Sequence, residues 1–327
     1  MQQLSWEDHM RINSLDAFRG LAILLMIFVH FINWFSKEVP LYLKYDLAKH
    51  VTLGDLVAPL FLVAVGISLW LSYSKRTEKG QKYLEIGKVY FKRYFLLIVV
   101  GLVLDMLRRG SINFTWGVLE TIGVAALIAF LLIRYSDKVL VAVIALSSAI
   151  YSYLSILPDF SYLVYHSPFG GMPAIISWLS LALIGVMIGK RLVKSFDEKK
   201  KFLLFLFKSA AVLIAVAVLL SFVVPLDRGL VSTSYVLLAS AGGLMVFSVL
   251  FFLIEQKGMK LRFLTDFGLS ALIVFIAQYL FIAIPIKLLG LHKAFPLANG
   301  IVIALLLALV FWFFVKVLKK YNVRLSF

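Results

Sequence analysis

Long apolar segments alternate with short polar ones along the whole chain. Ten of them approach the roughly 20 residues that an α-helix needs to cross a hydrocarbon core of about 30 Å. They cover residues 15–36, 54–74, 92–108, 116–134, 138–156, 173–189, 203–224, 233–254, 265–287 and 298–318. The pattern predicts an all-α, polytopic integral membrane protein with about ten transmembrane helices, arranged as one transmembrane domain over residues 1–327.

The prolines agree with these boundaries. Pro59 and Pro285 fall inside apolar segments, where neighbouring helices can satisfy the backbone groups that a proline frees. Five others lie between segments, as helix breakers should: Pro40, Pro158, Pro168, Pro225 and Pro296.

Composition fixes the class of protein and charge predicts its orientation. The chain is 62% hydrophobic and 15% charged, with a mean hydropathy of +0.97, which is far too apolar for a soluble domain. With the amino terminus inside, 23 of the 33 Lys and Arg residues fall in cytoplasmic segments and 8 on the opposite side. This bias predicts that both termini are cytoplasmic, and it accounts for most of the net charge of +16 without a nucleic-acid partner.

Two further features narrow the chemistry. The chain has no cysteine, which excludes disulfides, thiolate catalysis and cysteine-ligated metals. No spacing of His, Asp and Glu resembles a metal site, so we expect no metal.

The start of the chain is polar, with Glu7 and Asp8, unlike a secretory signal peptide, and we expect the first helix to be retained as an anchor.

The first apolar segment carries charged residues that need a reason to lie in a membrane. Asp16 stands one turn before Arg19, and the eleven steps from Arg19 to His30 return to nearly the same helix face, roughly 16 Å further along. Charged side chains inside a membrane are costly and usually functional. Residues 11–36 are therefore predicted to present a polar track that runs from the start of the helix towards the middle of the membrane.

Four stretches resemble the heparan-α-glucosaminide N-acetyltransferase-like family of membrane proteins. They are RINSLDAFRGLAILLMIFVHF at the start, VTLGDLVAPLFLVAVGISL from residue 51, GVLETIGVAALIAFLLI from residue 117 and PLDRGLVSTSYVLLASAGGLMVFSVLFFLIEQKG from residue 225. The spacing of Arg19 and His30 is also similar to the signature of the acyltransferase-3 membrane proteins, which are thought to belong to the same broad group.

The resemblance implies a membrane acyltransferase. Such enzymes take an acyl group, usually acetyl, from cytoplasmic acyl-CoA and deliver it to a hydroxyl or amine of an acceptor on the far side, commonly a carbohydrate or glycolipid. Arg19, with Asp16, would then position the donor near the inner side. His30, further along the same face, would meet the thioester and the acceptor; a neutral imidazole is the natural general base near pH 7.

The chain departs from the family pattern at three places. The position that matches His30 is an Asn in the heparan enzyme, whose catalytic His lies in the loop before the second helix; that loop here contains His50. Either His30 is the base, as in the acyltransferase-3 pattern, which we favour, or His50 shares or takes that role. The family's Asn-Lys pair appears here as Asp227-Arg228, and its Gln-Arg pair as Glu120-Thr121.

The remaining candidates each have a structural alternative. Asp55 would orient a histidine or grip the acceptor, or interact with a helix dipole. Ser232 and Ser234 would contact the donor, or cap a helix. Gln278 would line an acceptor cavity, or bond another helix.

Glu120 and Asp227 complete the predicted acceptor-binding set. For Glu120 the alternative is an ion pair with Arg108 or Arg109.

A transporter or flippase is the rival class, because intramembrane charges and prolines within helices are typical of transporters too. Against it, the two halves of the chain show no repeat. Expected partners are acyl-CoA, the acceptor and membrane lipids, and a homodimer is allowed. The lysine-rich, cysteine-free composition suits a thermophilic prokaryote, so we expect the cytoplasmic membrane of a prokaryote.

Overall fold

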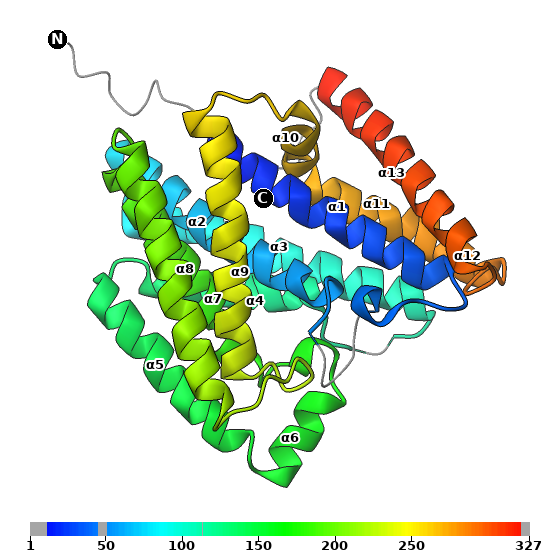
Figure 1. Cartoon of the computed structure of the whole chain (residues 1–327), viewed down its shortest axis with the longest axis horizontal. Coiled ribbons are helices and arrows are strands. Elements are labelled where there is room, and N and C mark those ends of the chain that lie inside the picture. The colour runs from blue at the N-terminus through cyan, green and yellow to red at the C-terminus, as the bar shows by residue number, and fades with distance from the viewer. Residues whose placement is uncertain (1–11, 45–50, 113, 322–327) are drawn as a thin grey trace.

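The computed structural model describes residues 12–44, 51–112 and 114–321, and within them the chain is helical, with a single isolated β-bridge between Ser36 and Phe295 (Figure 1). The elements in chain order are α1 (Asn13–Phe35), η1 (Leu41–Leu43), η2 (Gly54–Leu56), α2 (Val57–Glu78), α3 (Tyr83–Arg109), α4 (Val118–Leu132), α5 (Asp137–Leu154), α6 (Pro158–Tyr165), η3 (Pro168–Gly170), α7 (Ile175–Lys194), α8 (Lys199–Ser221), α9 (Thr233–Phe251), η4 (Phe252–Gln256), α10 (Arg262–Leu269), α11 (Ala271–Gln278), η5 (Tyr279–Ala283), α12 (Ile284–Leu288) and α13 (Leu297–Lys320).

The prediction of an all-α polytopic membrane protein is confirmed. Among the described residues, eight helical stretches are long and apolar enough to cross a membrane: α1, η2 with α2, α5, α7, α8, α9 with η4, α11 to α12, and α13. The two other predicted spans are α4, which is apolar but only 15 residues long, and α3. Helix α3 begins at Tyr83 rather than at residue 92, and the added turns carry Glu85 and Lys88, which the predicted apolar span left out.

The prediction of one continuous helix over residues 265–287 was wrong. The chain breaks at Ser270, between α10 and α11, and then passes through the π-helical turn η5 before α12. Pro285 lies in the first turn of α12, and it has no N–H to donate to the carbonyl of the residue four positions earlier, with which its ring also clashes. The π-helical turn just before it relieves that conflict. A further short helix that the sequence pattern did not predict, α6, lies between α5 and α7.

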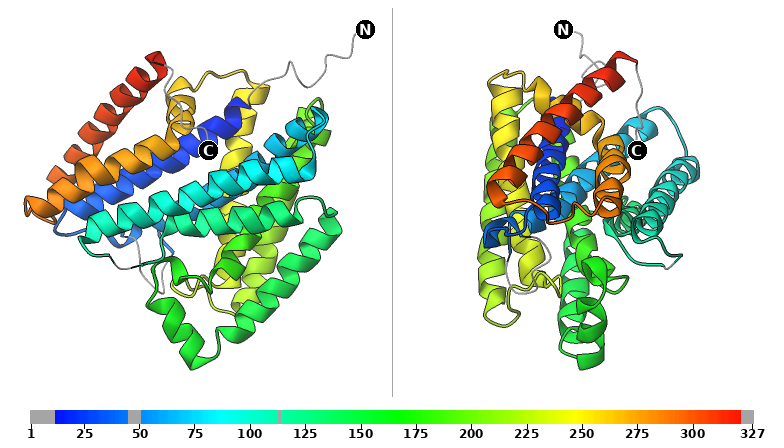
Figure 2. Two further views of the ribbon diagram at one scale, coloured as in Figure 1. Left: turned by 180° about the vertical axis from the view of Figure 1, so that it is seen from behind. Right: turned by 90° about the vertical axis from the view of Figure 1, so that its right-hand side faces the viewer.

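The helices divide into a central group and an outer group. In α7, 83% of an 18-residue apolar stretch is buried inside the protein. The same share is 11% in α5 and 17% in both α8 and α13. Figures 1 and 2 show α13 along one side of the molecule and α5 with α8 along the other, with α1, α2 and α7 between them. The exposed apolar faces of the outer helices are where lipid would lie.

Two pairs of glycines set the closest helix contacts. A Cβ atom added at Gly20 would overlap the backbone of α10, and one added at Gly268 would overlap the backbone of α1. Gly66 and Gly185 do the same where α2 crosses α7. Small residues at a crossing let two backbones approach closely, which is a common device in membrane bundles. The first pair fixes the part of α1 that carries the polar track.

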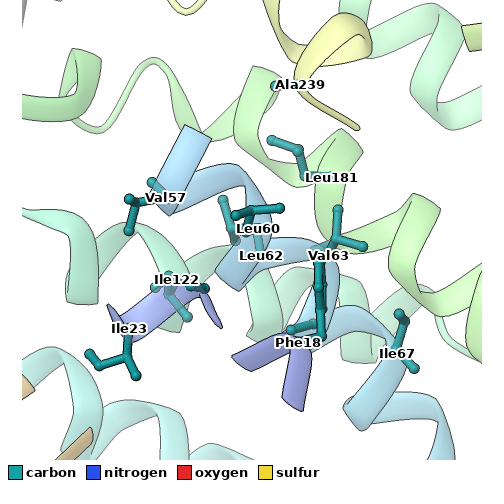
Figure 3. Close-up of a cluster of buried hydrophobic side chains, with 14 of the residues drawn as sticks. Phe18, Ile23, Val57, Leu60, Leu62, Val63, Ile67, Ile122, Leu181 and Ala239 are labelled. Carbon is teal, nitrogen blue, oxygen red and sulfur yellow. The ribbon is translucent and has the colours of Figure 1, made fainter. Parts of the chain in front are cut away.

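The core between these crossings is apolar. Figure 3 shows side chains from α1, α2, α4, α7 and α9 that meet there, among them Phe18, Ile23, Val57, Leu60, Leu62, Val63, Ile67, Ile122, Leu181 and Ala239. Because this packing holds α1 and α2 rigidly, the polar side chains on their other faces have fixed positions.

Candidate active site

A cavity of about 660 Å³ runs along the polar face of α1. It is lined on α1 from Asp16 to His30, which is about 21 Å of helix, and on α3 from Arg93 to Arg109, about 24 Å. The cavity therefore extends over most of a hydrocarbon core of about 30 Å. Its other walls come from η2, α2, α4, η3, α7, the loop before α9, α9, α10, α11 and η5.

The cavity has two polar ends, which we name after the sides predicted from charge. The inner end comprises Asp16, Arg19, Ser68, Arg93 and Tyr94. The outer end comprises His30, Asp55, Arg108, Glu120 and Arg228. The polar track predicted from the sequence of the first helix thus faces the cavity and joins its two ends.

At the inner end, the predicted pair forms. Arg19 lies 3.4 Å from Asp16 and donates a hydrogen bond to Ser68 of α2, whose own hydroxyl donates to the Ala64 carbonyl. The side chain of Arg19 is 26% exposed, so the guanidinium is held by its neighbours yet remains accessible from the cavity. A fixed, accessible guanidinium is suited to a phosphate or another anion.

Arg93 is an inner-end residue that sequence reasoning missed, because it was counted among the cytoplasmic charges. Its guanidinium lies 5.5 Å from the ring centre of Tyr94, and its Nε is buried without a hydrogen-bond partner among the described residues. The signal was in the spacing. Arg93 stands seven residues after Ile86 and four before Leu97, two members of the buried stripe of α3.

His30 is held by aromatic side chains at the start of the outer end. Its ring stacks on Trp34 with 5.1 Å between centres, and Tyr279 of η5 meets it edge-on at 6.1 Å. Gln278, the last residue of α11, lies beside it. The imidazole reaches the cavity from this enclosed position.

Asp55 lies in η2 and is only 4% exposed. Arg228 pairs with one of its carboxylate oxygens at 3.0 Å, and Thr52 donates to the other through its backbone N–H and its hydroxyl. The hydroxyl of Tyr235 donates to the Asp55 carbonyl at 2.6 Å. Asp55 therefore joins the start of α2 to the loop before α9, in addition to any contact with a ligand.

Glu120 reaches the cavity from the first turn of α4, with 1% of its surface exposed. Its Oε1 has no hydrogen-bond partner among the described residues. Two glycines leave the room that the carboxylate fills, since a Cβ at Gly101 would lie 2.6 Å from Oε1 and one at Gly117 would lie 2.7 Å from Oε2. Thr121 does not line the cavity: its hydroxyl donates a hydrogen bond to the Gly117 carbonyl and accepts one from the Trp116 indole N–H.

The expected partners of Glu120 are engaged with another acid. Arg108 and Arg109 lie 2.7 and 2.8 Å from Asp105, one turn back on α3. This charge cluster at the end of α3 lines the outer end of the cavity.

Asp227, Ser232 and Ser234 do not line the cavity. Asp227 accepts hydrogen bonds from Tyr165 and from the Leu230 backbone, and its own N–H donates to Ser232. Ser232 also caps α9, and Ser234 donates to the Val224 carbonyl. All three shape the loop before α9 at the outer side, far along the bundle from Arg19, so their positions do not favour the predicted ligand roles.

Two other positions bear on the predicted site. Gln278 is fully buried and does not line the cavity; its amide nitrogen lies 3.7 Å from the Met26 sulfur. His50, the alternative base, lies outside the residues that the structure describes.

Phe169 was missed because an aromatic residue in a loop gives no periodic signal. It lines the cavity from the turn after α6, in the left-handed region with φ of 54°. The indole N–H of Trp178 donates to the Phe169 carbonyl at 2.9 Å, and the centre of the Phe169 ring lies 5.5 Å from the Arg228 guanidinium. Bulky residues are held in this backbone region only where their surroundings fix them, often at ligand sites.

Fold and cavity together define an integral membrane protein with a cavity that has polar residues at both ends. Residues 11–222 match the family model described as heparan-alpha-glucosaminide N-acetyltransferase, catalytic, so the chain belongs to that family. Heparan-alpha-glucosaminide N-acetyltransferases of Homo sapiens and Mus musculus are each 35% identical to it over 95 residues. That alignment covers 29% of this chain and 14% of each relative.

Proposed function

We propose that the protein is a transmembrane acyltransferase that moves an acyl group, in the first place acetyl, from acyl-CoA to a hydroxyl or amine of a carbohydrate or glycolipid acceptor. The observation that carries this proposal is the cavity, because it joins a cationic inner end to an end that holds a histidine and a buried carboxylate. Membership of the family supports it, since the curated relatives are named as N-acetyltransferases.

The donor is proposed to enter at the inner end. Arg19 and Arg93 flank Tyr94 there and would bind the phosphates of acyl-CoA, while Asp16 and Ser68 keep the Arg19 guanidinium in place. Arginine suits phosphate because its planar donors can bind two oxygens at once. The positive-inside charge bias supports a cytoplasmic position for this end, with both termini on the same side.

The reaction is proposed to occur at His30. The acceptor oxygen or nitrogen attacks the thioester carbonyl and forms a C–O or C–N bond, while the C–S bond breaks. The imidazole of His30 takes the proton that the acceptor loses and gives it to the departing CoA thiolate. A positioned base contributes roughly 10²–10⁴-fold to such a step. His50 remains the alternative base.

The acceptor is proposed to occupy the outer end. Glu120 has a buried carboxylate oxygen available for a hydroxyl or amine, and Phe169 offers an aromatic wall. Asp55 acts here by fixing the walls, through its pair with Arg228. We assign Asp227, Ser232 and Ser234 to the support of the same loop.

The test measures acetyl-CoA binding and acyl transfer with detergent-purified protein. Arg19→Ala should abolish donor binding, whereas His30→Ala should keep it and lower transfer by about 10²–10⁴-fold. Arg191→Ala is the matched control, because Arg191 also lies at the inner side, in the last turn of α7, but does not line the cavity. His50→Ala separates the two candidate bases. Intact transfer in both histidine variants contradicts the mechanism.

The same experiment addresses transport, which a cavity with two polar ends would also serve. If the wild type binds neither acetyl-CoA nor longer acyl-CoAs, the acyltransferase proposal fails. Uptake of a labelled sugar or lipid into proteoliposomes without any acyl-CoA would then make transport the better account.

A further inference from the structure

Gln278 lies behind the proposed base. It is fully buried, it ends α11, and it sits beside His30 without lining the cavity. Its amide nitrogen has a weak contact with the Met26 sulfur at 3.7 Å, and its Oε1 has no hydrogen-bond partner among the described residues. A buried amide is costly unless its groups are paired, so an apolar residue would suit a purely structural position better.

The backbone directly after Gln278 is distorted, and the first residue of the distorted turn contacts His30. The π-helical turn η5 begins at Tyr279, and its wider turn carries one residue more than a regular turn would. Tyr279 contacts both His30 and Trp34, with 5.7 Å between the Tyr279 and Trp34 ring centres. The imidazole is thus flanked by two aromatic residues and one amide, and the amide offers both a donor and an acceptor for a directional hydrogen bond with a ring nitrogen.

We infer that Gln278 is a positioning residue that holds the His30 imidazole in one tautomer and one orientation, with its Oε1 accepting the ring N–H. A neutral imidazole has one donor and one acceptor nitrogen, so fixing the donor leaves the other nitrogen to act as base towards the cavity. This inference rests on the proposed role of His30. It replaces the predicted acceptor contact of Gln278, since an acceptor in the cavity does not reach a residue behind the wall.

Two variants of Gln278 distinguish positioning from packing. Gln278→Leu fills the space without an acceptor, and should lower kcat by about 10–100-fold with the KM for acetyl-CoA nearly unchanged. Gln278→Glu keeps an oxygen at the same place and should be about tenfold faster than Gln278→Leu. A packing role predicts the reverse order, because a buried carboxylate is costlier than leucine. That order, or an equal loss in both variants, overturns the inference.

A spectroscopic measurement keeps the inference testable apart from turnover. In protein labelled with ¹⁵N-histidine, the His30 signals are assigned by their loss in His30→Ala. The wild type and Gln278→Glu should show one neutral tautomer, and Gln278→Leu should show an average of two. If the wild type transfers no acetyl group yet its tautomer depends on Gln278, the proposed function fails and the positioning stands. If all three spectra agree, the positioning fails.

Discussion

The two ends of the cavity are built in different ways. The inner end consists of side chains on regular helices, since Arg19 and Ser68 come from α1 and α2, and Arg93 from α3. The outer end depends on short turns and loops, in which Asp55 sits in η2 and Arg228 in the loop before α9. At the inner end the Arg19 side chain is partly accessible, whereas at the outer end Asp55 and Arg228 form a buried pair. In the proposed function, the same residue types therefore serve binding at one end and architecture at the other.

The sharpest way to break this comparison is to remove one acid from each end. Asp55→Ala leaves Arg228, whose side chain is 11% exposed, without its 3.0 Å ion pair and should cost about 3–5 kcal/mol of unfolding free energy. Asp16→Ala should cost about 1 kcal/mol or less, because its partner Arg19 is 26% exposed. Reversible unfolding in mixed detergent micelles measures both.

The double variant Asp55→Ala with Arg228→Ala is the control for this pair, and should recover part of the loss because no buried charge is left behind. Equal costs for Asp16→Ala and Asp55→Ala would show that the ends do not differ as described.

The next largest effect is expected at the glycine that makes room for Glu120. In Gly101→Ala the new methyl would lie 2.6 Å from the Glu120 Oε1, so the carboxylate must move; overpacking of this kind costs about 1–3 kcal/mol. Acceptor KM should rise while acetyl-CoA binding stays unchanged. Gly242→Ala is the matched control, because a Cβ on that helical glycine meets open space. A rise in donor Kd with Gly101→Ala would contradict the division between the ends.

This contrast also explains what the sequence could predict. Helical periodicity is enough to put Arg19 and His30 on one face of the first helix, and the cavity lies along that face. The same periodicity includes Arg93, because its spacing from Ile86 and Leu97 places it with the buried stripe of α3. Ten apolar segments likewise indicated the helices, but not the break at Ser270 or the π-helical turn before Pro285.

The outer end was less predictable because its contacts join distant parts of the chain. Asp55 and Arg228 are separated by the seven helices α2 to α8, and no local pattern links them. Ser232 and Asp227 were expected to contact ligands, yet their hydrogen bonds serve the loop that carries Arg228. Such roles follow from tertiary packing, which single-sequence periodicity does not contain.

A smaller effect is expected from Arg93 and sharpens the assignment of the inner end. Arg93→Ala should weaken acetyl-CoA binding about tenfold, which corresponds to roughly 1.4 kcal/mol and to one lost charged hydrogen bond. Lys92→Ala is the control, because Lys92 is the neighbouring cation on α3 but is exposed and does not line the cavity. Calorimetric titration at fixed ionic strength measures both. Equal losses would reduce the role of Arg93 to general electrostatic attraction.

The smallest effect is expected from Tyr165, whose hydroxyl donates to Asp227 and so supports the loop of the outer end. Tyr165→Phe should cost about 1 kcal/mol of stability and leave donor binding intact, while Tyr162→Phe, on the same helix and 66% exposed, should cost nothing measurable. Burial, and then the Asp227 carboxylate, raise the pKa of Tyr165 above its ordinary value. Since the unfolded hydroxyl titrates near pH 10, the stabilisation should be complete below about pH 10 and lost as the pH rises further. A stability difference between wild type and Tyr165→Phe that grows above that pH would contradict this account of the loop.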